Sequence, residues 1–297
     1  MRTMDARRRL ERRRALRASV VALVSTVVVF GALGWIVVNA PGWADVQKSF
    51  LDGRVFVDSL PGILRSFLVN IQLFVVAEIL VLILGLVIAV LRSMPGPVFQ
   101  PVRILATIYA DIFRAIPGVV IIFLIGFGLP GLGLVDPRTD RLWLGIAALT
   151  LIYSAYVSEV YRAGIESVHP SQDAAARSLG MSRLQSLRHV VVPQAVRRVI
   201  PPLLNDFIGL QKDTVLVSLI GVVEIFRQSQ IRQSATFNFT PYLVTALVFL
   251  VVTIPLARFT DWLVARQRNR GSDPRASGAS TAARRGRLWG FGRRRDR

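Results

Sequence analysis

The stretch AAARSLGMSRLQSLRHVVVPQA, residues 174–195, lies between two long apolar segments and contains no acidic residue. It is basic, and it is interrupted by Gly180 and Pro193. A membrane-spanning segment would not carry this pattern, because charged side chains are costly inside a bilayer. The stretch is therefore interpreted as a polar loop that connects two membrane helices.

The residues of this loop predict a helix, a tight turn and a second helix. Ser171 suits an N-cap, and Asp173 in the first turn suits the helix dipole. Gly180 suits the left-handed residue that follows a helix. Ser182 and Gln185 have the spacing of a capping box for the second helix, and Pro193 is expected to limit that helix. A rigid, basic segment with small residues on its surface is typical of a docking surface.

The apolar segments on either side indicate an all-α integral membrane protein. Of all residues 53% are hydrophobic and the mean hydropathy is +0.50. A helix needs about 20 apolar residues to cross a bilayer, and the stretch ASVVALVSTVVVFGALGWIVVN has no charge over 22 positions. Six transmembrane helices are expected, at residues 18–39, 66–91, 105–132, 142–164, 200–223 and 241–262.

The net charge of +19 is concentrated at the two ends of the chain. Residues 1–17 contribute +6 and residues 265–297 contribute +9. Positive charge beside a span favours the cytoplasmic side and anionic membrane lipid. Both termini are therefore expected to be cytoplasmic, and membrane lipid is favoured over nucleic acid as their partner. Residues 270–297 have the composition of a disordered segment.

The motifs of common enzymes are absent from the sequence. No GxxxxGK[ST] motif occurs, so this chain has no P-loop for ATP. Its two histidines, His169 and His189, have no cluster of further metal ligands, and no metal site is expected. No nucleophile–histidine–acid set is recognisable. The chain is predicted not to be an enzyme and to bind no cofactor.

Two pairs of charged residues lie within the apolar segments. Asp111 and Arg114, and likewise Glu159 and Arg162, are spaced i,i+3 and can pair on a helix. Both pairs lie toward the predicted cytoplasmic half. They either anchor the ends of spans or line a substrate path, and the sequence leaves these two interpretations open.

The fifth span carries the densest polar series. It includes Asp206 and Asp213, which are seven residues apart and therefore on one helical face, with Gln211, Lys212 and Thr214 beside them. Such a helix must face protein or water. A lining of the translocation path is favoured over a structural role for these residues.

At the level of motifs the loop resembles the EAA loop of permease subunits of ABC importers. Ala174, Ala175 and Ala176, Gly180, Val190 and the Val192-Pro193 pair fall at the spacings of that motif. The stretches IYADIFRAIPGVVIIFLIGFGLP, SAYVSEVYRAGIESV and PQAVRRVIPPLLNDFIGLQKDTVLVSLIG resemble the polar amino acid permeases (histidine, glutamine, glutamate or arginine type). The resemblance covers roughly residues 62–265.

The resemblance implies a type I ABC importer permease fold with cytoplasmic coupling helices, in a bacterial plasma membrane. It implies ABC ATPase subunits that use ATP and Mg, a second permease that is identical or homologous, an extracellular binding protein and a small polar amino acid as substrate. The implied ATPase-coupling residues are Asp173, Ala174, Ala175, Ala176, Arg177, Gly180 and Pro193. The polar residues of the spans described above supply the candidate substrate path, which comprises Asp111, Arg114, Glu159, Arg162, Asp206, Gln211, Lys212, Asp213 and Thr214.

The domain boundaries follow from the extent of this resemblance. They are a basic cytoplasmic tail (1–17), an additional transmembrane helix with an outer segment (18–62), the permease core (63–265) with its loop at 170–195, and a basic, disordered cytoplasmic tail (266–297). Compared with the family motif, Ala174 replaces a glutamate, which would sit at N3 after Ser171 and complete a capping box. Another ABC importer class, an ATP-independent carrier or channel, and a membrane scaffold or sensor are the alternatives.

Overall fold

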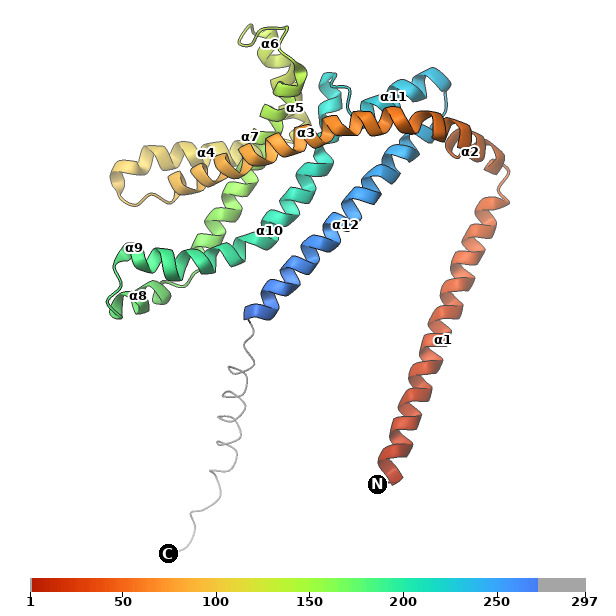
Figure 1. The fold of residues 1–297 in the computed structure, drawn as a ribbon, viewed down its shortest axis with the longest axis horizontal. Coiled ribbons are helices and arrows are strands. Elements are labelled where there is room, and N and C mark those ends of the chain that lie inside the picture. The colour runs from red at the N-terminus through yellow and green to blue at the C-terminus, as the bar shows by residue number, and fades with distance from the viewer. Residues whose placement is uncertain (1, 272–297) are drawn as a thin grey trace, which may run out of the picture.

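The computed structural model describes residues 2–271, with side chains described for 17–266. All regular elements in this part of the chain are helical (Figure 1). They are α1 (Arg2–Val38), α2 (Trp43–Phe50), α3 (Gly53–Arg92), η1 (Pro97–Phe99), α4 (Gln100–Ala115), α5 (Gly118–Phe123), η2 (Leu124–Gly128), α6 (Leu129–Gly131), α7 (Arg141–Glu166), α8 (Pro170–Ser178), α9 (Arg183–Ser186), η3 (Leu187–Val191), α10 (Val192–Asp213), η4 (Thr214–Ile220), α11 (Ile225–Thr236) and α12 (Thr240–Gly271).

Four helical segments are long and apolar enough to cross a membrane, by length and composition. They are Arg17–Val38, Trp43–Arg92, Arg141–Glu166 and Thr240–Arg266. A fifth crossing is provided if the bent pair Pro97–Ala115 and Gly118–Gly131 is one span. The remaining expected span, at residues 200–223, coincides with α10 and η4, and its polar residues keep it outside this group. The expected all-helical architecture is confirmed, and the count of six crossings stays a prediction.

The span expected at 105–132 is wrong as a single helix. Its two halves meet at an angle of 105° between Ala115 and Gly118. Pro117 has no backbone N–H, and it forces Ile116 into an extended conformation with ψ 132°. The chain therefore leaves α4 and starts α5 in a new direction.

The ends of the chain also differ from expectation. Helix α1 begins at Arg2 and includes most of the basic segment. The composition predicts disorder near the other end, yet α12 continues to Gly271; residues 272–297 of that predicted tail lie outside the described residues. Figure 1 shows the beginning of α1, the α8–α9 hairpin and the described end of α12 on one side of the molecule, and α2, α6 and α11 on the other.

Helix α1 stands apart from the rest of the chain (Figure 1), and its described side chains are exposed. The short helix α2 is attached to the start of α12 instead. Asn238 donates to the carbonyl of Lys48 at 2.8 Å, and the backbone N–H of Phe239 donates to the carbonyl of Ser49 at 2.7 Å. The Phe50 and Phe239 rings also stack, with centroids 5.0 Å apart. These contacts fix where the additional N-terminal segment joins the core.

The core lies where α3 crosses α7, with α5, α10 and η4 packed around the crossing. Its fully buried side chains include Leu73 of α3, Leu149 of α7 and Leu210 of α10. Close approach requires small residues. A Cβ atom on Gly145 of α7 would lie 2.2 Å from Cγ1 of Val217 in η4.

We therefore expect Gly145→Ala to lower the stability of the chain. The added methyl group has no space, and overpacking of this kind costs about 1–3 kcal/mol. Gly128→Ala is the matched control, because it is also a helical glycine and no atom lies within 4 Å of its added Cβ. Thermal unfolding of the purified variants measures the difference, and equal midpoints for both variants would contradict the packing described for α7 and η4.

Candidate functional site

Helix α8 begins two residues earlier than the sequence predicts. Its N-cap is His169, whose Nδ1 accepts a hydrogen bond from the backbone N–H of Ser171 at 3.2 Å. The assignment of Ser171 as N-cap is wrong, because Pro170 favours the first helical position, where its missing N–H costs nothing. Ala174 is thus the fifth residue of α8 and not its third. A glutamate at this position would not form a capping box, so the inference that Ala174 removes one is wrong.

The turn after α8 agrees with the sequence prediction. Gly180 has φ +87°, in the left-handed region that favours glycine. The N–H of Met181 donates to the carbonyl of Ala176, and the N–H of Gly180 donates to that of Arg177, which is a Schellman motif. The capping box at Ser182 is also confirmed, since its Oγ accepts from the N–H of Gln185 and its N–H donates to that side chain.

Pro193 does not end the second helix of the loop, and that expectation is wrong. Residues 183–213 form one nearly continuous helix in which a π-helical turn, η3, precedes α10. In this turn the N–H of Val192 donates to the carbonyl of Leu187. The wider turn accommodates the missing N–H of Pro193.

A hydrogen bond within the α8–α9 hairpin holds its two helices together. The hydroxyl of Ser186, which is buried, donates to Oδ1 of Asp173 at 2.6 Å. Ala176 is also buried, whereas Ala174 and Ala175 are exposed. The tip of the hairpin carries two largely exposed leucines, Leu179 and Leu184. The two helices of the hairpin are therefore held together by contacts between buried residues. Its exposed side chains are small, apolar or basic.

The charged residues of α3, α4 and α7 meet at Glu159. Its Oε2 lies 2.7 Å from Nη1 of Arg92 and 3.7 Å from Nη1 of Arg114, and its Oε1 pairs with Arg162. Arg162 also reaches Glu166 at 2.6 Å. The expected pair of Glu159 and Arg162 is confirmed. The expected pair of Asp111 and Arg114 is absent from the ion pairs of the described residues, because Arg114 turns toward Glu159 instead.

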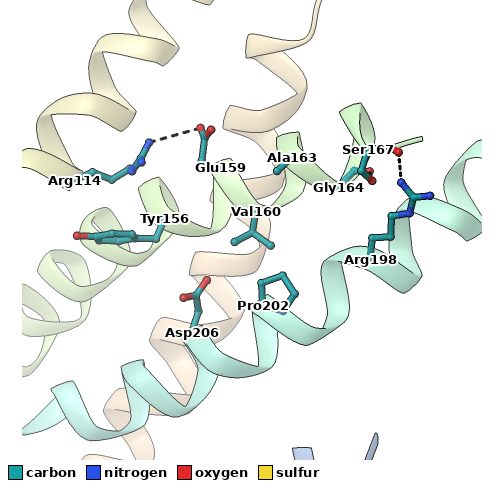
Figure 2. A pocket seen from close by; sticks show the side chains of 10 residues that line it. All are labelled: Arg114, Tyr156, Glu159, Val160, Ala163, Gly164, Ser167, Arg198, Pro202 and Asp206. Atoms are coloured by element: carbon teal, nitrogen blue, oxygen red, sulfur yellow. Dashed lines mark hydrogen bonds and ion pairs between the residues drawn. The ribbon is translucent and has the colours of Figure 1, made fainter. Parts of the chain in front are cut away.

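A cavity of about 390 Å³ opens beside this cluster (Figure 2). Its volume is in the range of small-molecule sites. Figure 2 shows Arg114 reaching from α4 toward Glu159 on α7, while Asp206 projects from α10. The residues that line the cavity are Arg114, Tyr156, Glu159, Val160, Ala163, Gly164, Ser167, Arg198, Pro202 and Asp206.

Asp206 has one carboxylate oxygen without a hydrogen bond, and Arg114 has only a long contact of 3.7 Å with Glu159. Oδ2 of Asp206 is buried and accepts no hydrogen bond from any described residue. Arg114 is the most distant of the three arginines around Glu159, whose carboxylate is already paired with Arg92 and Arg162. Arg198, also at the cavity, donates to the carbonyl of Ser167. The site therefore offers one carboxylate and one guanidinium to a ligand.

The other predicted path residues lie elsewhere. Asp213 accepts a hydrogen bond from the hydroxyl of Tyr153 at 2.7 Å. Gln211 and Thr214 are buried and bond to α12 and α3, whereas Lys212 is exposed. Asp111 is exposed on α4. The structure thus brings Arg114, Glu159 and Asp206 to one cavity, and Arg162 pairs with Glu159 without lining it. The remaining five residues do not line this cavity.

Several polar residues that organise these helices have no role predicted from the sequence. Arg92, which directly follows the span expected at residues 66–91, and Tyr153 are two of them. Asn70 is buried and donates to Oε2 of Glu224 at 3.0 Å. Glu224 lies outside the candidate spans, and burial raises its pKa, although bonds from Asn70 and two backbone N–H groups oppose the shift. In the sequence, the feature that could have indicated the buried role of Asn70 is its position as a lone asparagine in the apolar run FLVNIQLF.

The comparisons with known proteins show the family to which the chain belongs. A family model described as "Binding-protein-dependent transport system inner membrane component" matches residues 82–269. A probable glutamine ABC transporter permease protein of Bacillus subtilis (strain 168) is 39% identical over 185 residues, which are 62% of this chain and 83% of the relative. The arginine transport system permease protein of the same organism is 31% identical, over 69% of this chain and 92% of the relative.

Among solved structures, the crystal structure of an amino acid ABC transporter with histidines is similar, with a TM-score of 0.67 and 32% identity. The match covers 72% of this chain and 98% of that one. The chain belongs to the family of inner-membrane components of binding-protein-dependent transport systems. It is a multi-pass membrane permease subunit with the type I fold of ABC importers, and not an enzyme.

Proposed function

We propose that this chain forms the substrate path of an ATP-driven importer of small polar amino acids in a bacterial plasma membrane. The cavity beside Glu159 carries this proposal. An amino acid is a zwitterion, and the cavity offers the Asp206 carboxylate for its ammonium group and the Arg114 guanidinium for its carboxylate. The glutamine and arginine permeases among the relatives support the same substrate class.

The α8–α9 hairpin is proposed as the docking surface for ATPase subunits that use ATP and Mg. Its exposed surface includes Ala174, Ala175, Arg177 and Leu179. Asp173 and Gly180 act within the hairpin, one through Ser186 and the other through the turn. A second permease, identical or homologous, and an extracellular binding protein complete the proposed complex.

The proposed topology has six crossings and cytoplasmic termini. The bent α4–α5 pair would supply one crossing, and α10 with η4 another. Charge supports this orientation, since residues 1–17 and 265–297 carry 15 of the 19 excess positive charges. The position of the hairpin, on the same side as the beginning of α1, is consistent with it (Figure 1).

Asp206→Asn and Arg114→Gln are each expected to reduce uptake at least tenfold. A hydrogen bond to a charged group contributes about 1.5–3 kcal/mol, which corresponds to about 10–100-fold. The measurement is ATP-driven uptake of radiolabelled L-glutamine, L-arginine and L-glutamate by vesicles that contain the complete complex. Asp261→Asn is the control, because Asp261 is 74% exposed on α12 and lies outside the cavity.

These variants separate a binding role from a structural one. Both should co-purify with the ATPase subunits in normal amounts, because neither residue lies in the hairpin. Unchanged uptake of all three amino acids by both variants would exclude this cavity as the site. Failure of the unsubstituted complex to take up any of them would contradict the proposed substrate class.

A further inference from the structure

The short helix α2 separates an apolar face from a polar one. Trp43, Val46 and Phe50 are spaced i, i+3 and i+7, so they lie on one side of the helix. Asp45 and Lys48 lie on the opposite side. None of the residues of α2, all of which the structure describes, is buried, and Val46 and Phe50 are 41% and 45% exposed. The rest of the chain therefore covers the apolar face of α2 only in part.

The start of α12 holds α2 in place and extends its apolar face. Besides the two hydrogen bonds described above, the N–H of Asp52, just after α2, donates to the hydroxyl of Thr240 at 3.1 Å. Phe239, whose ring stacks on Phe50, stays 40% exposed, and Phe237 before it is 84% exposed. Apolar side chains from two distant segments are thus held next to one another. We call them the outer apolar patch, which comprises Trp43, Val46, Phe50, Phe237 and Phe239.

The neighbouring helices place this patch at the surface of a bilayer. The apolar span of α1 ends at Val38, and residues 39–42 join it directly to α2, while the candidate span of α12 begins at Thr240 (Figure 1). The candidate span Trp43–Arg92 has 50 residues. At 1.5 Å per residue it is about 75 Å long, more than twice the hydrocarbon thickness of about 30 Å. Its first part, which is α2, therefore lies outside the hydrocarbon core.

Lipid is favoured over a protein partner as the environment of the patch. The described side chains of α1 are all exposed, and Figure 1 shows α1 apart from the other helices, so this chain leaves the span that leads into α2 to the surrounding lipid. The patch continues that lipid-facing surface. Aromatic rings are enriched at membrane–water interfaces, and an amphipathic helix lies in the plane of the interface with its apolar face toward the acyl chains.

We propose that α2 is an interfacial helix that binds the outer leaflet of the membrane through the outer apolar patch. Trp43, Val46 and Phe50 face the acyl chains, and Asp45 and Lys48 face water. Because hydrogen bonds join α2 to α12, the helix also fixes the depth of the α11–α12 turn in the membrane. The partner is the lipid surface itself. The inference takes from the proposed function only the assignment of this side of the molecule to the outside.

Nitroxide labels on opposite faces of α2 test this proposal, and they can be attached to single introduced cysteines because the chain contains none. Val46→Cys reports on the apolar face and Lys48→Cys on the polar face. Val28→Cys is the reference within the span of α1, where Val28 is 61% exposed. The complete complex is placed in nanodiscs of phosphatidylethanolamine and phosphatidylglycerol. Electron paramagnetic resonance measures collisions of each nitroxide with oxygen and with a water-soluble nickel chelate, and the unsubstituted complex corrects for label on the partner subunits.

The nitroxide at position 46 is expected to lie about 5–10 Å into the boundary between headgroups and acyl chains. It should collide often with oxygen and seldom with nickel, whereas the nitroxide at position 48 should meet nickel freely and that at position 28 should lie deepest. Equal nickel accessibility at positions 46 and 48 would overturn the proposal. Shielding of position 46 from both reagents, in the complex alone or after addition of the loaded binding protein, would show that protein covers the patch and would also overturn it.

A second measurement separates this inference from the proposed topology. On intact cells, a membrane-impermeant maleimide should react with Lys48→Cys and spare Val28→Cys. Failure of Lys48→Cys to react would contradict the outer location of α2, and with it both the inference and the proposed topology. Normal reaction of Lys48→Cys together with equal nickel accessibility at positions 46 and 48 would overturn the inference alone.

Discussion

Substitution of Gly180 by valine is expected to abolish coupled transport while the protein remains in the membrane. Gly180 has φ +87°, and a β-branched residue reaches this conformation only with strain of about 1–3 kcal/mol. The strain would break the turn whose bonds join Met181 to Ala176 and Gly180 to Arg177. The angle between α8 and α9 would change, and the proposed docking surface with it.

The readouts are ATP hydrolysis and amino acid uptake by the reconstituted complex. Gly180→Asn is the matched control, because asparagine tolerates the left-handed conformation far better than valine does. It should retain most of the coupled activity. Coupled transport by Gly180→Val at the normal rate would mean that this hairpin does not connect the permease to its ATPase.

Substitution of Glu159 by alanine is expected to have the largest effect on stability. It leaves Arg92 without its carboxylate at 2.7 Å, and it removes one of the two acidic partners of Arg162. The Arg92–Glu159 pair is half-buried, with side chains 11% and 26% exposed. Removal of one partner from a fully buried ion pair costs about 3–5 kcal/mol, because the remaining charge is uncompensated, and partial exposure places the expected cost at or below the lower end of that range.

Thermal unfolding and the yield of assembled complex measure this loss. Glu166→Ala is the control on the same helix, since Glu166 is 60% exposed and contacts only Arg162 among the ion pairs of the described residues. Exposed pairs contribute about 0–1 kcal/mol. Similar stability of the two variants would argue against a structural role for the cluster around Glu159.

Local backbone features of the loop are the most predictable from the sequence. Gly180 and the capping box at Ser182 involve residues close together in the chain, whose preferences are set by nearby backbone geometry. The errors in the same loop come from proline. Pro170 places the start of α8 earlier than predicted, and a π-helical turn accommodates Pro193.

Contacts between helices are less predictable, because spacing along one helix does not show what the neighbouring helix presents. The spacing predicts that Arg114 pairs with Asp111 three residues away, yet Arg114 turns toward Glu159 of α7. A shared helical face likewise groups Asp213 with Asp206. In the structure Asp213 accepts a hydrogen bond from Tyr153 of α7, whereas Asp206 lines the cavity. Single-helix periodicity carries no information about such partners.

The most direct test of the importer function compares the complete complex with this chain alone in sealed vesicles. The complex is purified with its ATPase subunits and binding protein, and uptake of radiolabelled L-glutamine, L-arginine and L-glutamate is measured with ATP or with a non-hydrolysable analogue. We predict uptake of at least one amino acid, only with hydrolysable ATP and only when all components are present. Uptake of the same amino acid by this chain alone, without ATP, would contradict the importer function and indicate an independent carrier or channel.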